Sequence, residues 1–190
     1  MTGIPGVGKT TVLNELKDLA KQNRVNLTVM NFGTIMNEIT RELGKDMNRD
    51  EMREQGIETQ RKLQELAANE ISNRAGQGTV VVDTHMFVRT SVGMWAGLPQ
   101  NVLQKLSPRL FVLVEAEPEQ IARRRQSDTD RKRDMTLAED IRFDLEWSRA
   151  TAAASAVATG APVKVIRNDA GRQKQAAQEL FEAIRKLVGT

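Results

Sequence analysis

The chain contains no cysteine and no tyrosine among its 190 residues, and its only aromatic residues are five Phe and two Trp. Without cysteine, disulfide bonds and thiolate metal sites are excluded, and with them the zinc sites that cysteine builds. So few aromatic rings are poor material for stacking the bases of a single strand. We therefore expect no zinc and no single-stranded nucleic acid partner.

Long apolar runs are also lacking. No stretch approaches the about 18–20 consecutive apolar residues that a membrane-spanning helix needs, and no signal-peptide pattern opens the chain. We therefore expect a cytoplasmic protein that does not bind membranes. The formal net charge of +3 is mildly basic, which suits polyanionic substrates but does not identify them.

Glycine, by contrast, is concentrated at the start, where MTGIPGVGKTT contains the phosphate-loop motif G-x-x-x-x-G-K-[ST] at positions 3–10. Glycines let successive N–H groups converge on a phosphate, and the helix expected over 10–22 adds its positive end. We expect Lys9 to reach the β- and γ-phosphates of a nucleoside triphosphate and Thr10 to offer its hydroxyl to Mg²⁺. The expected triphosphate-binding residues are Gly3, Ile4, Pro5, Gly6, Val7, Gly8, Lys9, Thr10 and Thr11.

Apolar runs alternate with amphipathic helical patterns along the chain, which is typical of a mostly parallel α/β sheet. The runs that read as strands are 25–32, 79–85, 109–116 and 163–168. Helical patterns are found at 34–44, 50–54, 57–75, 136–158 and 171–188. The sequence thus predicts one α/β domain over 1–190. A phosphate loop ordinarily follows a further, central strand, but only Met1 and Thr2 precede the first glycine.

Asp83 follows the apolar run 80–82, which places a carboxylate at the carboxyl edge of the sheet. In P-loop enzymes this position holds the acid that orients Mg²⁺ or its waters, although an Asp capping the following loop would give the same pattern. His85 is the only histidine. Phosphoryl transfer to a phosphate needs little proton chemistry, so we expect His85 to be a hydrogen-bonded structural residue.

Six basic residues are gathered in the segment 123–133. A solvated helix face or a nucleic-acid patch would also explain them. We favour a catalytic lid, because arginines on a mobile segment can close over a triphosphate, stabilise the transferring group and exclude water. Arg149 on the next helix could point at the same phosphates, and Arg89 would lie near the acceptor.

Together these segments resemble the archaeal-type adenylate kinases, a branch of the P-loop nucleoside monophosphate kinases, over essentially the whole chain. The resemblance rests on GIPGVGKTT at 3–11, NFGT at 31–34, NRDEMR at 48–53, VVDTH at 81–85, RTSVGMWAGLP at 89–99, DTDRKRD at 128–134 and TGAPVKVIRN at 159–168. It implies reversible, Mg²⁺-dependent phosphoryl transfer from ATP to AMP, giving two ADP. It also implies a three-layer P-loop NTPase fold with a parallel sheet of order 2-3-1-4-5, an AMP-binding helical region at 31–75 and a short lid at 123–135.

The resemblance implies roles for individual residues as well. Thr10 would ligate Mg²⁺, with Asp83 in its outer shell. The implied catalytic residues are Lys9, Arg89, Arg124, Arg131, Arg133 and Arg149. The implied AMP-binding residues are Gly33, Thr34, Arg53 and Arg89, with Arg53 standing in for an arginine that short bacterial enzymes place where this chain has Asn37. The archaeal branch also implies a homotrimer.

Other functions fit the same loop. One is a P-loop kinase for another acceptor, such as CMP, dTMP or a small metabolite, and a second is an RNA-binding P-loop protein that uses the arginines of 123–133. A GTPase switch is disfavoured, because the guanine-binding N-K-x-D motif is absent and DTHM lacks the glycine of D-x-x-G.

Family members carry several residues ahead of T-G-x-P-G that form the central strand. We therefore expect a mis-assigned start or a truncation rather than a native four-stranded sheet. An apolar hexapeptide restored ahead of Thr2 should then raise both activity and melting temperature.

Overall fold

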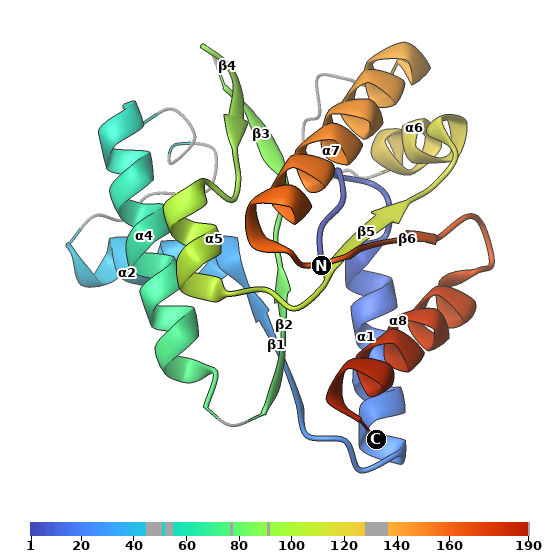
Figure 1. Cartoon of the computed structure of the whole chain (residues 1–190). Coiled ribbons are helices and arrows are strands. Elements are labelled where there is room, and N and C mark those ends of the chain that lie inside the picture. The colour runs from blue at the N-terminus through green and yellow to red at the C-terminus, as the bar shows by residue number, and fades with distance from the viewer. Residues whose placement is uncertain (45–50, 52–54, 77, 91, 128–136, 190) are drawn as a thin grey trace.

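The computed structural model describes residues 1–44, 51, 55–76, 78–90, 92–127 and 137–189. Four of its strands form two parallel pairs (Figure 1). In one, β1 (Leu27–Asn31) pairs with β2 (Thr79–Asp83). In the other, β5 (Phe111–Glu115) pairs with β6 (Val163–Arg167). Each of the expected strand regions therefore contains a strand, and the alternating α/β pattern is confirmed.

The first two residues join these pairs where a central strand would run. Met1 makes two hydrogen bonds with the backbone at the end of β2, of 2.8 and 3.1 Å, and Thr2 makes two with the backbone of β5, of 2.7 and 2.9 Å. Thr2 also forms a parallel bridge with Leu113. The spatial order is thus β1, β2, residues 1–2, β5, β6. This is the expected order 2-3-1-4-5, with its first strand reduced to two residues.

Next to these two residues, a cavity of about 600 Å³ lies between β2 and β5. Apolar side chains from strands and helices line it, including Val81, Phe111, Ile71, Leu103 and Leu180. Among the described residues no strand pairs β2 with β5. Along the part of their length beside this cavity, β2 and β5 therefore have no described strand between them.

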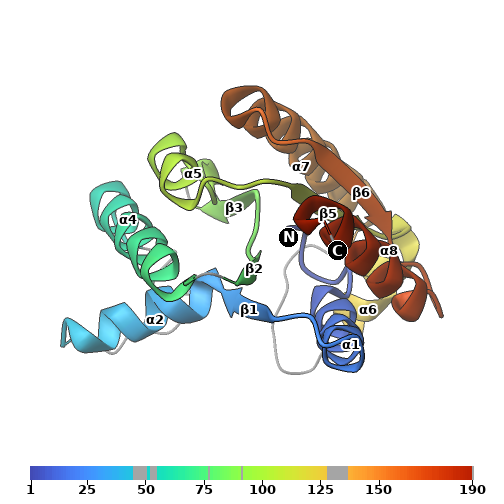
Figure 2. The same cartoon turned by 60° about the horizontal axis from the view of Figure 1, so that its bottom comes forward.

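Helices cover both faces of the strands. Their bounds are α1 (Lys9–Gln22), α2 (Phe32–Glu42), α4 (Ile57–Arg74), α5 (Gln100–Leu106), α6 (Pro118–Gln126), α7 (Ala138–Thr159) and α8 (Gln173–Val188). Figure 2 shows α5 and α7 on one side of the line of strands and α1 and α8 on the other, which gives the expected three layers. None of the described helices combines the length and apolar character needed to cross a bilayer.

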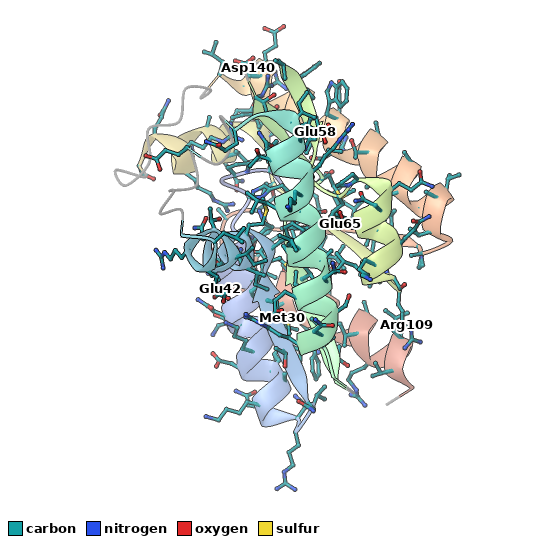
Figure 3. All side chains as sticks on the ribbon, turned by 90° about the vertical axis from the view of Figure 1, so that its left-hand side faces the viewer. Met30, Glu42, Glu58, Glu65, Arg109 and Asp140 are labelled. Atoms are coloured by element: carbon teal, nitrogen blue, oxygen red, sulfur yellow. The ribbon has the colours of Figure 1, made fainter. Side chains whose placement is uncertain are left out.

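The apolar periodicity of the sequence explains how these layers form. In α1 the apolar positions recur at three- and four-residue spacing, and Val12, Leu13, Leu16 and Ala20 are all buried. All five residues of β5 are buried, as in strands covered on both faces. Figure 3 looks onto α4, along which Glu58 and Glu65 are exposed.

Two elements were not foreseen. A short antiparallel hairpin of β3 (Phe87–Thr90) and β4 (Gly93–Ala96) follows β2, and α5 precedes β5. Each is only a few residues long, too short for a hydrophobic period to stand out. The helical pattern expected at 50–54 lies outside the described residues except for Glu51, which is helical.

Candidate active site

The phosphate loop runs from the two-residue stub directly into α1. Its backbone has positive φ at Gly6 (93°) and Gly8 (86°), a conformation that side chains with a Cβ rarely adopt. Space is limited as well, since a Cβ at Gly8 would lie 2.5 Å from the Asn168 side-chain nitrogen. The glycines of the motif are therefore required by both conformation and packing. The loop ends at the N-terminus of α1, where backbone N–H groups favour an anion.

Lys9 is buried at the first position of α1. Its Nζ donates a 2.7 Å hydrogen bond to the Gly3 carbonyl, so that the side chain folds back across its own loop. The same Nζ lies 3.4 Å from Nε2 of His85. The histidine thus has a polar contact, as expected, and the contact is with the lysine of the phosphate loop. Thr10 and Thr11 follow at the exposed end of α1.

Asp83 lies at the carboxyl end of β2, beside Asn31 of β1. Its Oδ2 accepts a 2.8 Å hydrogen bond from the Asn31 side chain. Its Oδ1 is buried and accepts no hydrogen bond from the described residues. Buried carboxylate oxygens normally have a partner. An orphaned oxygen beside a phosphate loop therefore fits a metal ion or a metal-bound water.

A second cavity, of about 110 Å³, is lined by Asp83 and His85. Gly33 lines it at the start of α2, and Gln60 and Gln64 line it from α4. Thr34, the other residue expected here, is a neighbour of Gly33 whose N–H donates a 2.9 Å hydrogen bond to Asn31 Oδ1. Sequence reasoning missed Asn31, which caps α2 and also holds Asp83.

Arginines of α6 hold the phosphate loop from outside. One guanidinium nitrogen of Arg124 lies 3.4 and 3.3 Å from the carbonyl oxygens of Gly6 and Val7, and another donates to the Asn168 carbonyl at 3.0 Å. Arg125, which was not singled out, donates a 2.9 Å hydrogen bond to the Pro5 carbonyl.

The basic segment from residue 128 onward lies outside the described residues. Arg131 and Arg133, like Arg53 of the expected AMP site, lie outside the described residues. Their expected roles stay predictions.

Arg149, on α7, is paired with a buried acid. It donates hydrogen bonds of 2.7 and 2.6 Å to the two carboxylate oxygens of Glu115 at the end of β5. These bonds raise the pKa of Arg149 above its ordinary value. Arg167 approaches the same carboxylate at 3.8 Å. A carboxylate with only 1% of its surface exposed is thus compensated by two arginines.

Arg89, on β3, is paired in the same way. Its guanidinium donates hydrogen bonds of 3.0 and 2.5 Å to Asp144 Oδ1 in the middle of α7. The other oxygen of Asp144 lies 3.8 Å from Arg125. Two predicted arginines, Arg89 and Arg149, are therefore each anchored by a carboxylate that sequence reasoning did not identify.

The residues that sequence reasoning missed differ in whether a local sequence pattern marks them. Asn31 and Glu115 each end a strand, and Asn168 directly follows one. A polar residue at the end of an apolar run is the signal that singled out Asp83, and the same signal could have found these three. Asp144 lies within a helix among many charged residues, where no local pattern distinguishes it.

Comparison with known proteins gives the following similarities. A family model described as an AAA domain matches residues 2–142. The adenylate kinase of Methanoculleus marisnigri is 40% identical over 185 residues, covering 97% of this chain and 96% of its own length. The adenylate kinase of Sulfurisphaera tokodaii is 40% identical over 188 residues, with 97% of each chain covered. Among solved structures, shikimate kinase from Acinetobacter baumannii in complex with shikimate superposes with a TM-score of 0.62 at 18% identity, over 97% of this chain and 90% of that one. At this identity the last similarity concerns the fold alone.

Proposed function

Because the chain belongs to the adenylate kinase family, we propose that it catalyses reversible transfer of the terminal phosphoryl group of ATP to AMP, giving two ADP. The observation that carries this proposal is that the phosphate loop lies next to the second cavity. Lys9 of the phosphate loop lies 3.4 Å from His85, and His85 lines the cavity that also contains Gly33 and Asp83. A donor phosphate on the loop and an acceptor in that cavity would be neighbours.

On the donor side, the backbone of residues 3–8 and the N-terminus of α1 hold the triphosphate. The loop is held in shape from outside by Arg124 and by the Asn168 side chain, which donates to the Val7 carbonyl at 2.8 Å. Lys9 exchanges its contact with the Gly3 carbonyl for one with the β- and γ-phosphates. This placement supplies positive charge where the transferring group carries its negative charge.

Thr10 and Asp83 are the residues that would hold Mg²⁺, Thr10 directly and Asp83 through water. A divalent cation neutralises charge on the phosphates in this class of reaction. The buried, unpartnered Oδ1 of Asp83 supports this assignment. Asn31 keeps the carboxylate in place by its hydrogen bond to Oδ2.

On the acceptor side, the helical region 31–75 binds AMP, with Gly33 and Thr34 at the start of α2. Arg53 and Arg89 bind the AMP phosphate. The exposure of Arg89 supports this role, because its side chain on β3 remains 36% exposed although Asp144 binds it. Asp144 accepts hydrogen bonds from Nε and Nη2 of its guanidinium, and the exposed part of the side chain is available to a ligand.

The segment 123–135 serves as the lid. Within it Arg124 touches the loop, and the remaining residues Arg131 and Arg133 would add charge stabilisation over the transferring phosphoryl group. Arg149 joins them from α7. Its pairing with Glu115 fixes the guanidinium at the carboxyl end of β5.

We also propose a cytoplasmic homotrimer without zinc. An exposed stripe on α7 supports self-association. It consists of positions that alternate by four and three residues and so share one helix face: Phe143, Trp147, Ala150, Ala154 and Val157, all exposed. Measuring the mass of the protein in solution by light scattering would test the trimer.

The reaction is tested with ATP as donor and a panel of acceptors: AMP, CMP, UMP, dTMP and shikimate. We expect kcat/KM for AMP to exceed that for each other acceptor by at least about tenfold, the scale of one lost hydrogen-bonded base contact. Equal or better turnover of CMP or UMP would overturn the AMP assignment. Phosphorylation of shikimate alone would overturn the nucleotide acceptor altogether.

A further inference from the structure

We propose that Asp144 is a positioning residue that orients Arg89 toward the acceptor phosphate and links it to the phosphate loop through Arg125. The inference rests on the proposed function, because it takes the ligand of Arg89 to be the phosphate of a nucleoside monophosphate. Asp144 itself touches neither nucleotide site.

Asp144 joins three parts of the molecule that are distant in sequence. From α7 it accepts two hydrogen bonds from Arg89 on β3 at its Oδ1, and its Oδ2 faces Arg125 of α6 at 3.8 Å. Arg125 in turn donates to the Pro5 carbonyl in the phosphate loop at 2.9 Å. A continuous polar chain therefore runs from the acceptor-side arginine to the donor-side loop.

Burial along this chain is uneven. The side chains of Asp144 and Arg125 are 8% and 4% exposed, whereas that of Arg89 is 36% exposed. Asp144 and Arg125 are thus fixed parts of the interior, and Arg89 is the end that reaches the surface. The exposed end of the chain is a guanidinium group, whose positive charge favours an anionic ligand.

The hydrogen bonds of Arg89 show which nitrogen atoms of its guanidinium remain for a ligand. Asp144 takes Nε and one terminal nitrogen, Nη2. A guanidinium has two such forks, and the one formed by Nη1 and Nη2 still carries N–H groups that can bind a phosphate bidentately. Phe143 supports the group from the side, with its ring centroid 5.5 Å from the guanidinium carbon. Asp144 and Phe143 together restrict a side chain that would otherwise lose much rotamer freedom on binding.

The Asp144 carboxylate also acts against acceptor binding, because it competes with the phosphate for the guanidinium of Arg89. The geometry favours orientation over competition, since Asp144 occupies one fork and leaves the other. Removing its charge should therefore weaken acceptor binding, although it removes a negative charge from the neighbourhood.

The test replaces Asp144 by Asn in the full chain, with steady-state kinetics in ATP and AMP. We expect the KM for AMP to rise about tenfold, the equivalent of one lost charge-assisted hydrogen bond, while the KM for ATP changes less than about threefold. In an Arg89→Ala background the same substitution should change the AMP KM less than about twofold, because two residues that act together are not additive. Asp144→Glu, which keeps the charge but moves the carboxylate by one methylene, should raise the AMP KM at least about threefold.

Ser155→Ala is the matched control. Ser155 is a buried polar residue of the same helix, and its hydroxyl donates a hydrogen bond to the Thr151 carbonyl one turn earlier. It should leave both KM values unchanged even if the melting temperature falls. An AMP KM that is unchanged or lowered in Asp144→Asn or Asp144→Glu, or raised equally with and without Arg89, would overturn the positioning role and leave the proposed function standing. A wild-type protein that does not phosphorylate AMP would overturn both.

Discussion

The α-amino group of Met1 should make the stability of this 190-residue chain depend on pH between about pH 6 and 8. The group is buried beside the cavity between β2 and β5 and donates a 2.8 Å hydrogen bond to the Val82 carbonyl. Burial lowers its pKa from 8.0 to about 6, against an opposing influence of the Asp83 charge and with a smaller contribution from Lys9. In the unfolded chain the group regains its ordinary pKa.

The size and sign of the effect follow from this difference. Two pKa units at about 1.4 kcal/mol each give about 3 kcal/mol, an upper limit because the adjacent cavity can admit water. Between about pH 6 and 8 the unfolded chain binds the proton more tightly, so the free energy of unfolding rises with pH. Below this window the full penalty of burying the charged group is present, and above it both states are neutral and the penalty is gone.

The assay is urea denaturation followed by tryptophan fluorescence from about pH 5.5 to 8.5, on the free chain and on a chain acetylated at Met1. Acetylation removes the charge but keeps an N–H for the Val82 carbonyl. Every other ionisable group is common to both forms and cancels in the comparison. The acetylated form should be more stable by up to about 3 kcal/mol at the acidic end and equally stable at the basic end. Parallel stability curves for the two forms would show that the amino group is not buried as described.

Three further changes should have measurable effects. An apolar hexapeptide fused ahead of Met1 should extend the two-residue stub into the 600 Å³ cavity and raise both the melting temperature and the rate of ADP formation. A Gly-Ser hexapeptide, which lacks apolar side chains, should raise neither as much. Equal effects of the two peptides would exclude filling of the cavity as the cause. Glu115→Gln should lower the melting temperature by about 2–8 °C in a thermal melt, because it removes the countercharge of Arg149 and Arg167. The two arginines are 53% and 35% exposed, so water screens them and the cost is about 1–2 kcal/mol. An unchanged melting temperature would mean that the pair does not stabilise the fold. Asp83→Asn should raise the Mg²⁺ concentration for half-maximal activity about 10–100-fold, and an unchanged Mg²⁺ dependence would remove Asp83 from the metal site.

The parts of the fold that could be predicted are those encoded locally. The phosphate loop follows from fixed glycines and Lys9, and the strands follow from apolar runs with polar ends, of which Asp83 is an example. The expected sheet order came from the family resemblance, and the hydrogen bonds of Met1 and Thr2 with β2 and β5 give the same order. The hairpin of β3 and β4 was not predicted because its strands are only four residues each.

What could not be predicted is the pairing of charges across the sequence. Arg89 and Asp144 are 55 positions apart, and Glu115 and Arg149 are 34 apart. Nothing in the neighbourhood of either arginine reveals its carboxylate, because the fold alone brings the two together. For the same reason the expectation that Arg149 points at phosphates gave no hint of Glu115. Arg125, although it lies within the expected lid 123–135, was not given a role of its own.

The central claim, that the phosphate loop of this chain delivers a phosphoryl group to AMP, is tested most directly by the initial rate of ADP formation from ATP and AMP in the wild type and in Lys9→Ala. Lys17→Ala, an exposed lysine of the same helix, serves as control. The wild type and Lys17→Ala should be active, and Lys9→Ala should lose at least about 10²-fold, the scale for removing one preorganised charge-stabilising donor. Full activity in Lys9→Ala would contradict the account.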